Sequence, residues 1–154
     1  MEIPISLPLD NDGFLRRECP HCMQEFKWHE GPANEEAEKM GDSGIYHCPL
    51  CGQSADPDSW WTQEQLDYAQ EAAMPSALRS LEDELNKTFR RASNKHMTIK
   101  RTGHLDPPDE PMPLVEKDDM SIVTSPCHAY EPVKIPETAA GPFHCLICGS
   151  PFAL

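Results

Sequence analysis

The chain has no long hydrophobic run. No stretch approaches the roughly 18 consecutive apolar residues that a membrane-spanning helix needs, so the sequence predicts no membrane partner. Residues Met1 to Pro8 lack the basic flank and apolar segment of a secretory signal or membrane anchor. We therefore expect a cytoplasmic protein.

Apolar residues of every kind are scarce as well. Only 38% of the 154 residues are hydrophobic and 16 are proline, which argues against one large apolar core. Lobes of about 50 residues bury too little surface to fold unaided, so another source of stability is needed. The sequence predicts a bound metal as part of the fold.

Basic residues are few. The chain has 13 Lys and Arg against 26 Asp and Glu, which gives a net charge of −13. A molecule this acidic repels DNA or RNA unless its bases are gathered in one place. A protein partner with a basic face is the simpler expectation for this acidic protein.

Cysteine, by contrast, is plentiful, and most of the seven cysteines form Cys-x-x-Cys pairs. Each pair spans a tight turn that aims two sulfurs at one ion, and two such turns make the four-thiolate cage that structural zinc prefers. A rubredoxin-like iron centre would use the same ligands. The first predicted metal site, site 1, consists of Cys19, Cys22, Cys48 and Cys51.

Residues 14–53 resemble the zinc-ribbon group, whose hallmark is two knuckles of the Cys-Pro-x-Cys-Gly type. Gly52 completes the second knuckle, whereas Met23 stands where the first knuckle usually has glycine. The resemblance is one of fold. Zinc ribbons in general often serve transcription and RNA-processing assemblies, so it also implies a role of that kind.

Residues 120–154 are similar to a degenerate second copy of the first segment. Pro142 to Gly149 echoes Ile45 to Gly52, and Cys127 lies upstream of it. Seven cysteines and one histidine would complete two tetrahedra, so we expect two Zn²⁺ ions. The second predicted site, site 2, consists of Cys127, His128, Cys145 and Cys148.

The fourth ligand of site 2 has alternatives. Neighbouring residues rarely point at one ion without a sharp turn, so His144 and His104 compete with His128. A site that kept three cysteines and a water would instead permit zinc hydrolysis.

The sequence pattern of residues 59–103 predicts a helical segment. Thr62 to Gln65 fits a capping box, and a helix from Gln63 to about Met74 follows. Pro75 then kinks this helix or begins a second one. Apolar residues at steps of three and four form a stripe that faces the core, another subunit or a partner: Leu78, Leu81, Leu85 and Phe89.

The helical segment ends in a basic stretch without acids. Bases at a helix C-terminus complement its dipole, but this stretch holds more than capping needs. It is the candidate nucleic-acid contact: Lys87, Arg90, Arg91, Lys95, Lys100 and Arg101. The acidic, proline-rich segment 104–119 can fold back onto it.

Short strands are expected around the cysteines. A hairpin is predicted over Ile5 to Arg17, with its turn at Asp10 to Gly13. Glu25 to His29 should be a return strand with Phe26 and Trp28 on one face. Residues 31–44 read as a loop with at most one helical turn, and a strand follows at 45–47.

Together these patterns predict an α+β fold with two zinc-ribbon-like lobes joined by a long kinked helical segment. The expected domains are 1–58, 59–103, 104–119 and 120–154. No nucleophile–base pair or phosphate loop is present at motif spacing, so the leading hypothesis is a non-enzymatic adaptor that binds another protein. Nucleic-acid binding is the alternative, a zinc hydrolase is third, and the helix stripe offers a surface for homo-oligomers.

Overall fold

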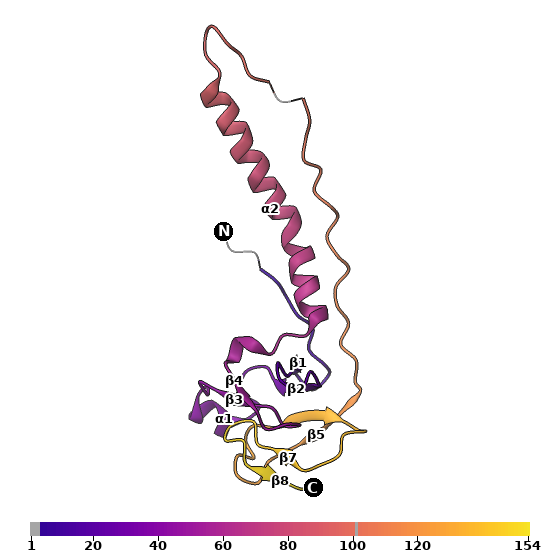
Figure 1. The fold of residues 1–154 in the computed structure, drawn as a ribbon. Helices are drawn as coiled ribbons and strands as arrows, with labels where there is room; N and C mark the ends of the chain where they lie inside the picture. Colours follow the sequence, from indigo (N-terminus) through magenta and orange to yellow (C-terminus); the bar gives the residue numbers. More distant parts are fainter. Residues whose placement is uncertain (1–3, 101) are drawn as a thin grey trace. The chain divides into compact units, whose positions relative to one another are not determined.

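The computed structural model describes residues 4–100 and 102–154, and its fold is α+β as predicted (Figure 1). The chain divides into two compact units. One, called the cysteine unit here, comprises Leu7–Gln65 and Leu114–Leu154 and holds both cysteine-rich segments. The other, the helical unit, comprises Met1–Ser6 and Leu66–Pro113.

A four-stranded antiparallel sheet joins the two cysteine-rich segments. Across the sheet the strands are β1 (Phe14–Glu18), β2 (Glu25–His29), β6 (Val133–Pro136) and β5 (Met120–Val123). The central pairing places Lys27 opposite Lys134 and Trp28 opposite Val133. Because side chains alternate along a strand, Phe26, Val133 and Ile135 enter the core while the two lysines face the other side.

Two small hairpins follow the same plan in both segments. Strand β3 (Tyr46–His47) pairs with β4 (Ser54–Ala55), and β7 (Phe143–His144) pairs with β8 (Pro151–Phe152). The hairpin β1–β2 likewise matches β5–β6 in chain order and antiparallel pairing. The two cysteine-rich segments therefore repeat one arrangement of strands, and each is called a copy below in this sense.

The predicted hairpin over Ile5 to Arg17 is wrong. Residues 5–9 form no strand, and β1 pairs with β2 instead. Pro8 has no N–H to donate to a ladder, which disfavours a strand there. The predicted turn does form: Asp10 Oδ1 accepts hydrogen bonds from the backbone N–H of Asp12 and of Phe14, each at 3.0 Å.

The segment after β2 contains more helix than the single turn expected. Helix α1 (Glu35–Met40) has six residues. Its N-cap Asn34 accepts a hydrogen bond from Ala37 N at 2.9 Å, and Glu35 and Glu36 complement the dipole of the first turn. The cap explains why this polar stretch forms a helix.

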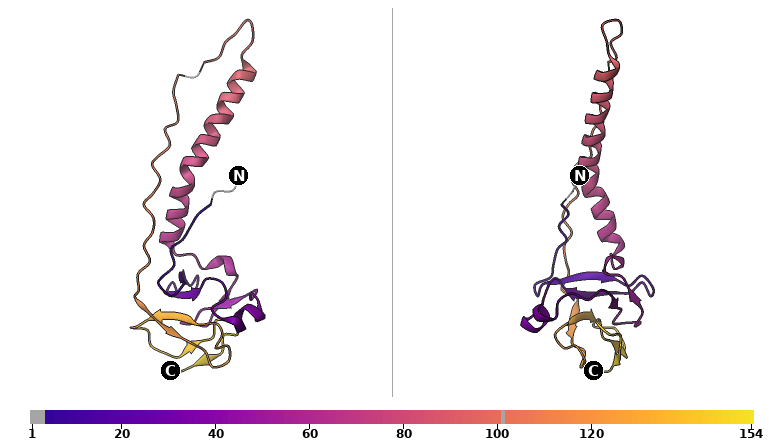
Figure 2. Two further views of the ribbon diagram at one scale, coloured as in Figure 1. Left: turned by 180° about the vertical axis from the view of Figure 1, so that it is seen from behind. Right: turned by 90° about the vertical axis from the view of Figure 1, so that its left-hand side faces the viewer.

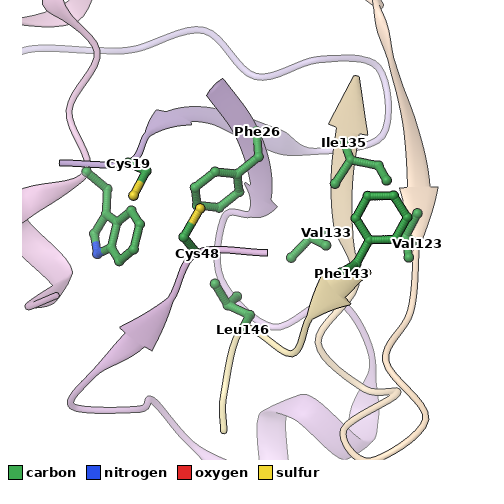
Figure 3. Close-up of a cluster of buried hydrophobic side chains, with 9 residues drawn as sticks. Cys19, Phe26, Cys48, Val123, Val133, Ile135, Phe143 and Leu146 are labelled. Carbon is green, nitrogen blue, oxygen red and sulfur yellow. The ribbon is translucent and has the colours of Figure 1, made fainter. Parts of the chain in front are cut away.

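The core of the cysteine unit packs around aromatic residues and the cysteines themselves (Figure 3). Phe26 and Trp60 are both fully buried, with ring centroids 5.6 Å apart in an edge-to-face arrangement. Trp60 follows a short 3₁₀ helix, η1 (Pro57–Ser59). Cys19 and Cys48 are fully buried in this cluster, so groups that could bind a metal belong to the hydrophobic core.

Helix α2 (Gln63–Ala92) begins at the predicted capping box. Thr62 N donates to Gln65 Oε1 and Gln65 N donates to Thr62 Oγ1, both at 3.1 Å, which confirms the box. The helix continues through Pro75, so no second helix begins there. None of the helices in residues 4–100 and 102–154 is long and apolar enough to cross a membrane.

Within the helical unit the chain turns after α2 and returns beside it in extended form (Figures 1 and 2). Ser93 Oγ accepts a hydrogen bond from Ile99 N at 2.9 Å and stabilises this turn. On the return, His104 Nδ1 lies 3.3 Å from Glu82 Oε1. The proline-rich stretch therefore begins along the helix.

A row of three bases crosses the sheet face that points away from the core. Arg16 stands opposite Lys27, and Lys27 stands opposite Lys134. Acids from the turn before β1 and from the segment before β5 surround this row: Asp10, Asp12, Glu116, Asp118 and Asp119. The last acids of the predicted linker thus pair with the sheet.

Candidate metal centres

All three Cys-x-x-Cys turns have the same backbone geometry. In each, the residue after the second cysteine donates its N–H to the carbonyl of the first cysteine: Met23 to Cys19 at 3.0 Å, Gly52 to Cys48 at 2.8 Å and Gly149 to Cys145 at 2.8 Å. That residue has a positive φ in every case, which explains the glycines. Met23 adopts the same conformation with a φ of 60° despite its side chain.

These turns bring the four sulfurs of site 1 together. All four ligand atoms lie within 4.8 Å of one another. The Sγ atoms of Cys19 and Cys51 are 3.6 Å apart, and those of Cys22 and Cys48 are 3.8 Å apart. Four Zn–S bonds of 2.3 Å in a tetrahedron require sulfurs about 3.8 Å apart, so the donor set fits a zinc ion.

The surroundings affect the thiols of site 1 unequally. Burial raises the pKa of Cys48 far above its usual range. Burial acts in the same direction on Cys19, but hydrogen bonds from the backbone N–H of Cys22 and His21 outweigh it and lower the pKa of Cys19. A bound cation would hold all the sulfurs as thiolates, because metal ligands must be deprotonated.

The structure also brings together the four residues of site 2. Cys127 Sγ lies 3.4 Å from Cys148 Sγ, and Cys145 Sγ lies 3.3 Å from His128 Nδ1. The chain bends at residues 126–127, where His128 N donates a hydrogen bond to Ser125 Oγ at 3.3 Å, and this bend lets the neighbouring residues Cys127 and His128 face one point. Both clusters can therefore hold a metal ion, which is consistent with zinc-ribbon-like sites.

The alternative histidines lie elsewhere. His144 Nδ1 is 3.2 Å from the carbonyl oxygen of Gly149 and is not in the cluster. His104 belongs to the helical unit, where it contacts Glu82. The described residues thus offer His128 as the nitrogen donor of site 2.

Site 2 departs from site 1 in a way that the sequence analysis missed. Aligning Pro126 with Pro20 places Ser125 at the position of Cys19. Ser125 is buried and donates a hydrogen bond to Cys145 Sγ at 3.1 Å. Cys127, one position beyond the proline, supplies the sulfur instead. The shared proline was the signal that could have revealed this shift.

The two copies contact each other at their second knuckles. His47 N donates to Leu146 O at 2.8 Å, and His144 N donates to Pro49 O at 2.9 Å. In addition, the His47 ring covers Gly149, just as the ring of His144 covers Gly52. Each glycine is needed both for its positive φ and for the space that the opposite histidine fills.

The basic stretch lies at the end of α2 and just beyond it. Lys87, Arg90, Arg91, Lys95 and Lys100 are all exposed, and Arg101 lies outside the described residues. Lys87 Nζ is 3.4 Å from Glu84 Oε1, a surface pair of little energetic weight.

The predicted apolar stripe also lies on α2. Leu78, Leu85 and Phe89 are half-buried in the helical unit, whereas Leu81 is 50% exposed. Leu85 and Phe89 line a hollow together with residues of the returning chain. Part of the stripe is therefore covered by this chain itself.

The chain matches no protein-family model, and neither a curated protein nor a solved structure matches it significantly. Any statement about its function therefore rests on the chemistry and geometry of its own residues.

Proposed function

We propose that both clusters bind Zn²⁺ and that the protein is a non-enzymatic, zinc-stabilised module that binds another protein. The observation that carries this proposal is that each cluster offers four protein ligands. Four ligands fill the tetrahedron of a structural zinc ion and leave no position for a substrate water. A zinc hydrolase would need that open position.

Zinc suits these clusters better than disulfides do. Sulfurs 3.4 to 3.8 Å apart are well beyond the bond length of about 2.05 Å in a disulfide. Thiolates on zinc persist where thiols stay reduced, which favours the cytoplasm. The ions would join knuckles that are far apart in the sequence and contribute on the order of 10 kcal/mol each to folding.

Metal analysis of the purified protein tests the first part. We expect two zinc ions per chain, with X-ray absorption giving seven sulfur neighbours and one nitrogen over the two ions. Cys22→Ser should remove one zinc and Cys148→Ser the other. Iron in either site, fewer than two ions per chain, or a water ligand would contradict the proposal.

The partner surface is proposed to lie on α2. Leu66 is 47% exposed, Met74 38% and Leu81 50%, so the described residues of the helical unit leave a large part of each of these apolar side chains uncovered. An amphipathic helix commonly lays such residues in the groove of a partner. The net charge of −13 favours a partner with a basic face.

A photo-crosslinking residue at Leu81 tests this surface in cells, with the same residue at Glu84 as the matched control. We expect one discrete adduct from position 81. An adduct of twice 17.3 kDa would identify a second copy of this chain. No adduct from position 81, or the same adducts from both positions, would argue against α2 as the interface.

Nucleic-acid binding is the second candidate, favoured by the exposure of Arg90, Arg91 and Lys95 at the end of α2. Phosphate contacts by these bases would make affinity fall steeply with salt. A gel shift at low salt with the double variant Arg90→Glu/Arg91→Glu distinguishes the two functions. Binding that the variant loses supports this candidate, and no binding by the native protein rejects it.

A further inference from the structure

Arg17 differs from the other buried bases of the sheet. Arg16, Lys27 and Lys134 each contact at least two carboxylates. Arg17 points to the opposite face of the sheet and is only 7% exposed. Its Nε has no hydrogen-bond partner among the described residues. Glu30 interacts electrostatically with Arg17, but among the described residues no carboxylate forms an ion pair with it. Because a buried charge without a close partner opposes folding, this arrangement calls for an explanation.

The guanidinium of Arg17 lies over the rings of two tryptophans. Its central carbon lies 4.8 Å from the ring centroid of Trp28 and 5.0 Å from that of Trp61. The group is charged at neutral pH, as arginine side chains are in proteins. Stacking leaves the N–H donors along the edge of the plane, in the fork geometry that a carboxylate accepts.

Arg17 lines a hollow in the cysteine unit with a volume of about 450 Å³. One wall is aromatic: the rings of Trp28 and Tyr46 lie with centroids 4.8 Å apart. The lining combines residues of both copies, since Glu131 comes from the segment before β6. This volume is sufficient for a ligand the size of an amino acid or a dipeptide.

Acids gather in the same hollow. Its lining includes four carboxylates: Glu30, Glu38, Asp42 and Glu131. Burial raises the pKa of Glu131; the nearby His29, which also lines the hollow, opposes this effect, and the charge of Asp42 adds to it. A positive group among these acids would relieve their mutual repulsion.

We propose that this hollow binds a small zwitterion, a free amino acid or short peptide, whose carboxylate pairs with Arg17 and whose ammonium lies among Glu131, Asp42 and the Trp28–Tyr46 wall. A ligand with only a negative charge would be repelled by the four carboxylates, and a ligand with only a positive charge would be repelled by the buried guanidinium. A molecule that carries both charges satisfies both ends. This site does not depend on which partner or metal the proposed function assigns.

Isothermal titration calorimetry of the metal-loaded, 154-residue protein with each of the twenty amino acids in turn tests the proposal. At least one should bind with a Kd below about 10 mM. L-phenylalanine has two matched probes, 3-phenylpropionate without the amine and phenethylamine without the carboxylate. For whichever amino acid binds, the analogues lacking one charge should bind at least about tenfold more weakly.

Variants then locate the site. Arg17→Gln and Glu131→Gln should each weaken binding at least about tenfold, whereas the exposed control Arg79→Gln should not change it. If Arg17→Gln fails to fold, Arg17→Lys keeps the charge without the planar fork and should also bind more weakly. No binding by any amino acid at about 10 mM, equal binding of single-charge analogues, or unchanged binding by the Arg17 variants would overturn the proposal.

Discussion

Lys27 and Lys134 stand directly opposite each other on β2 and β6, and both side chains are buried. Like charges in this position normally destabilise a sheet. Asp10 resolves the conflict, because its Oδ2 lies 3.3 Å from Lys27 Nζ and 2.7 Å from Lys134 Nζ. Asp10 is the carboxylate that the two lysines share, and Glu116 and Asp12 each pair with one of them at 2.9 and 2.7 Å.

Replacing Asp10 should therefore destabilise the protein strongly. Asp10→Asn removes the counter-ion that the two buried ammonium groups share, while Glu116 stays 2.9 Å from Lys27 Nζ and Asp12 stays 2.7 Å from Lys134 Nζ. Because each ammonium keeps one close carboxylate, we expect a loss of about 1.5–3 kcal/mol of unfolding free energy. Asp118→Asn is the matched control, since Asp118 Oδ1 lies 3.7 Å from Lys134 Nζ with its side chain 64% exposed. Urea unfolding should give a loss of less than about 1 kcal/mol for the control. Equal losses would contradict the role given to Asp10.

The same carboxylate should make stability depend on pH. Burial raises the pKa of Asp10, but hydrogen bonds from Lys134, from the backbone N–H of Phe14 and Asp12, and from Lys27 outweigh it, so the pKa lies well below its ordinary value. A depressed pKa gives stability that is present above the unfolded pKa of about 3.9 and lost as the pH falls below it.

The stability difference between the native protein and Asp10→Asn should therefore shrink as the pH falls below about 4. Acid also removes metal from thiolates, but this affects both proteins and largely cancels in the difference. Unfolding followed by tryptophan fluorescence from neutral to acidic pH checks this prediction. A difference that stays constant over the range would show that Asp10 is not the titrating group.

The contact between the copies gives a prediction at Gly149. Its φ is +74°, and a Cβ there would lie 2.6 Å from Cδ2 of His47. Gly149→Ala should cost roughly 1–2 kcal/mol for the left-handed backbone, with the clash in addition. Adding His47→Ala should restore the part due to the clash, as a double-mutant cycle measures.

Gly44→Ala is the control for this position. Gly44 has nothing within 4 Å of an added Cβ, and its φ lies outside the left-handed range. We expect a change of less than about 0.5 kcal/mol in thermal or urea unfolding. A Gly149→Ala variant as stable as this control would contradict the contact.

Met23 offers a stabilising substitution. Its φ is 60°, where the other two knuckles have glycine, and its side chain is 67% exposed. Met23→Gly should remove a cost of roughly 1–2 kcal/mol, reduced by the greater chain entropy of glycine, for a net gain of about 0.5 kcal/mol. Met40→Gly, at an exposed methionine in the last turn of α1, should instead lower stability. Chemical denaturation of both variants decides the sign.

Site 2 should lose its metal before site 1. Cys127 and Cys148 are exposed, whereas Cys19 and Cys48 are buried, so a chelator reaches site 2 more easily. Zinc release followed with a coloured chelator should show two phases, and Cys127→Ser should abolish the faster one. Release of both zinc ions in a single phase would contradict the proposed difference in chelator access to the two sites.

Ser125 provides the rescue for that variant. Its Oγ lies 3.1 Å from Cys145 Sγ at the position of the first cysteine of a knuckle. The double variant Ser125→Cys/Cys127→Ser should therefore bind two zinc ions again, while Cys127→Ser alone retains one firmly. A double variant that still binds one ion would show that Ser125 does not lie at a ligand position.

Much of the local structure followed from short patterns. The capping box at Thr62, the return strand at Glu25 to His29 and the cysteine groups were predictable because each depends on residues close in sequence or on a ligand count. The hairpin at Ile5 to Arg17 was not, because its apolar start has no partner strand and Pro8 cannot donate. Local pattern gives the tendency to form a strand, and only packing gives its partner.

The sequence by itself determined that two sets of thiols would meet, because Cys-x-x-Cys turns form locally and a tetrahedral ion needs four donors. The tertiary structure decided which histidine joins site 2, that β2 pairs with β6, and that Asp10 lies between two buried lysines. The pairing of β2 with β6 and the contact of Asp10 with Lys134 join residues more than about a hundred positions apart, and no local pattern specifies such a pairing. They depend on the two copies packing against each other, which buries the charges and fixes their partners.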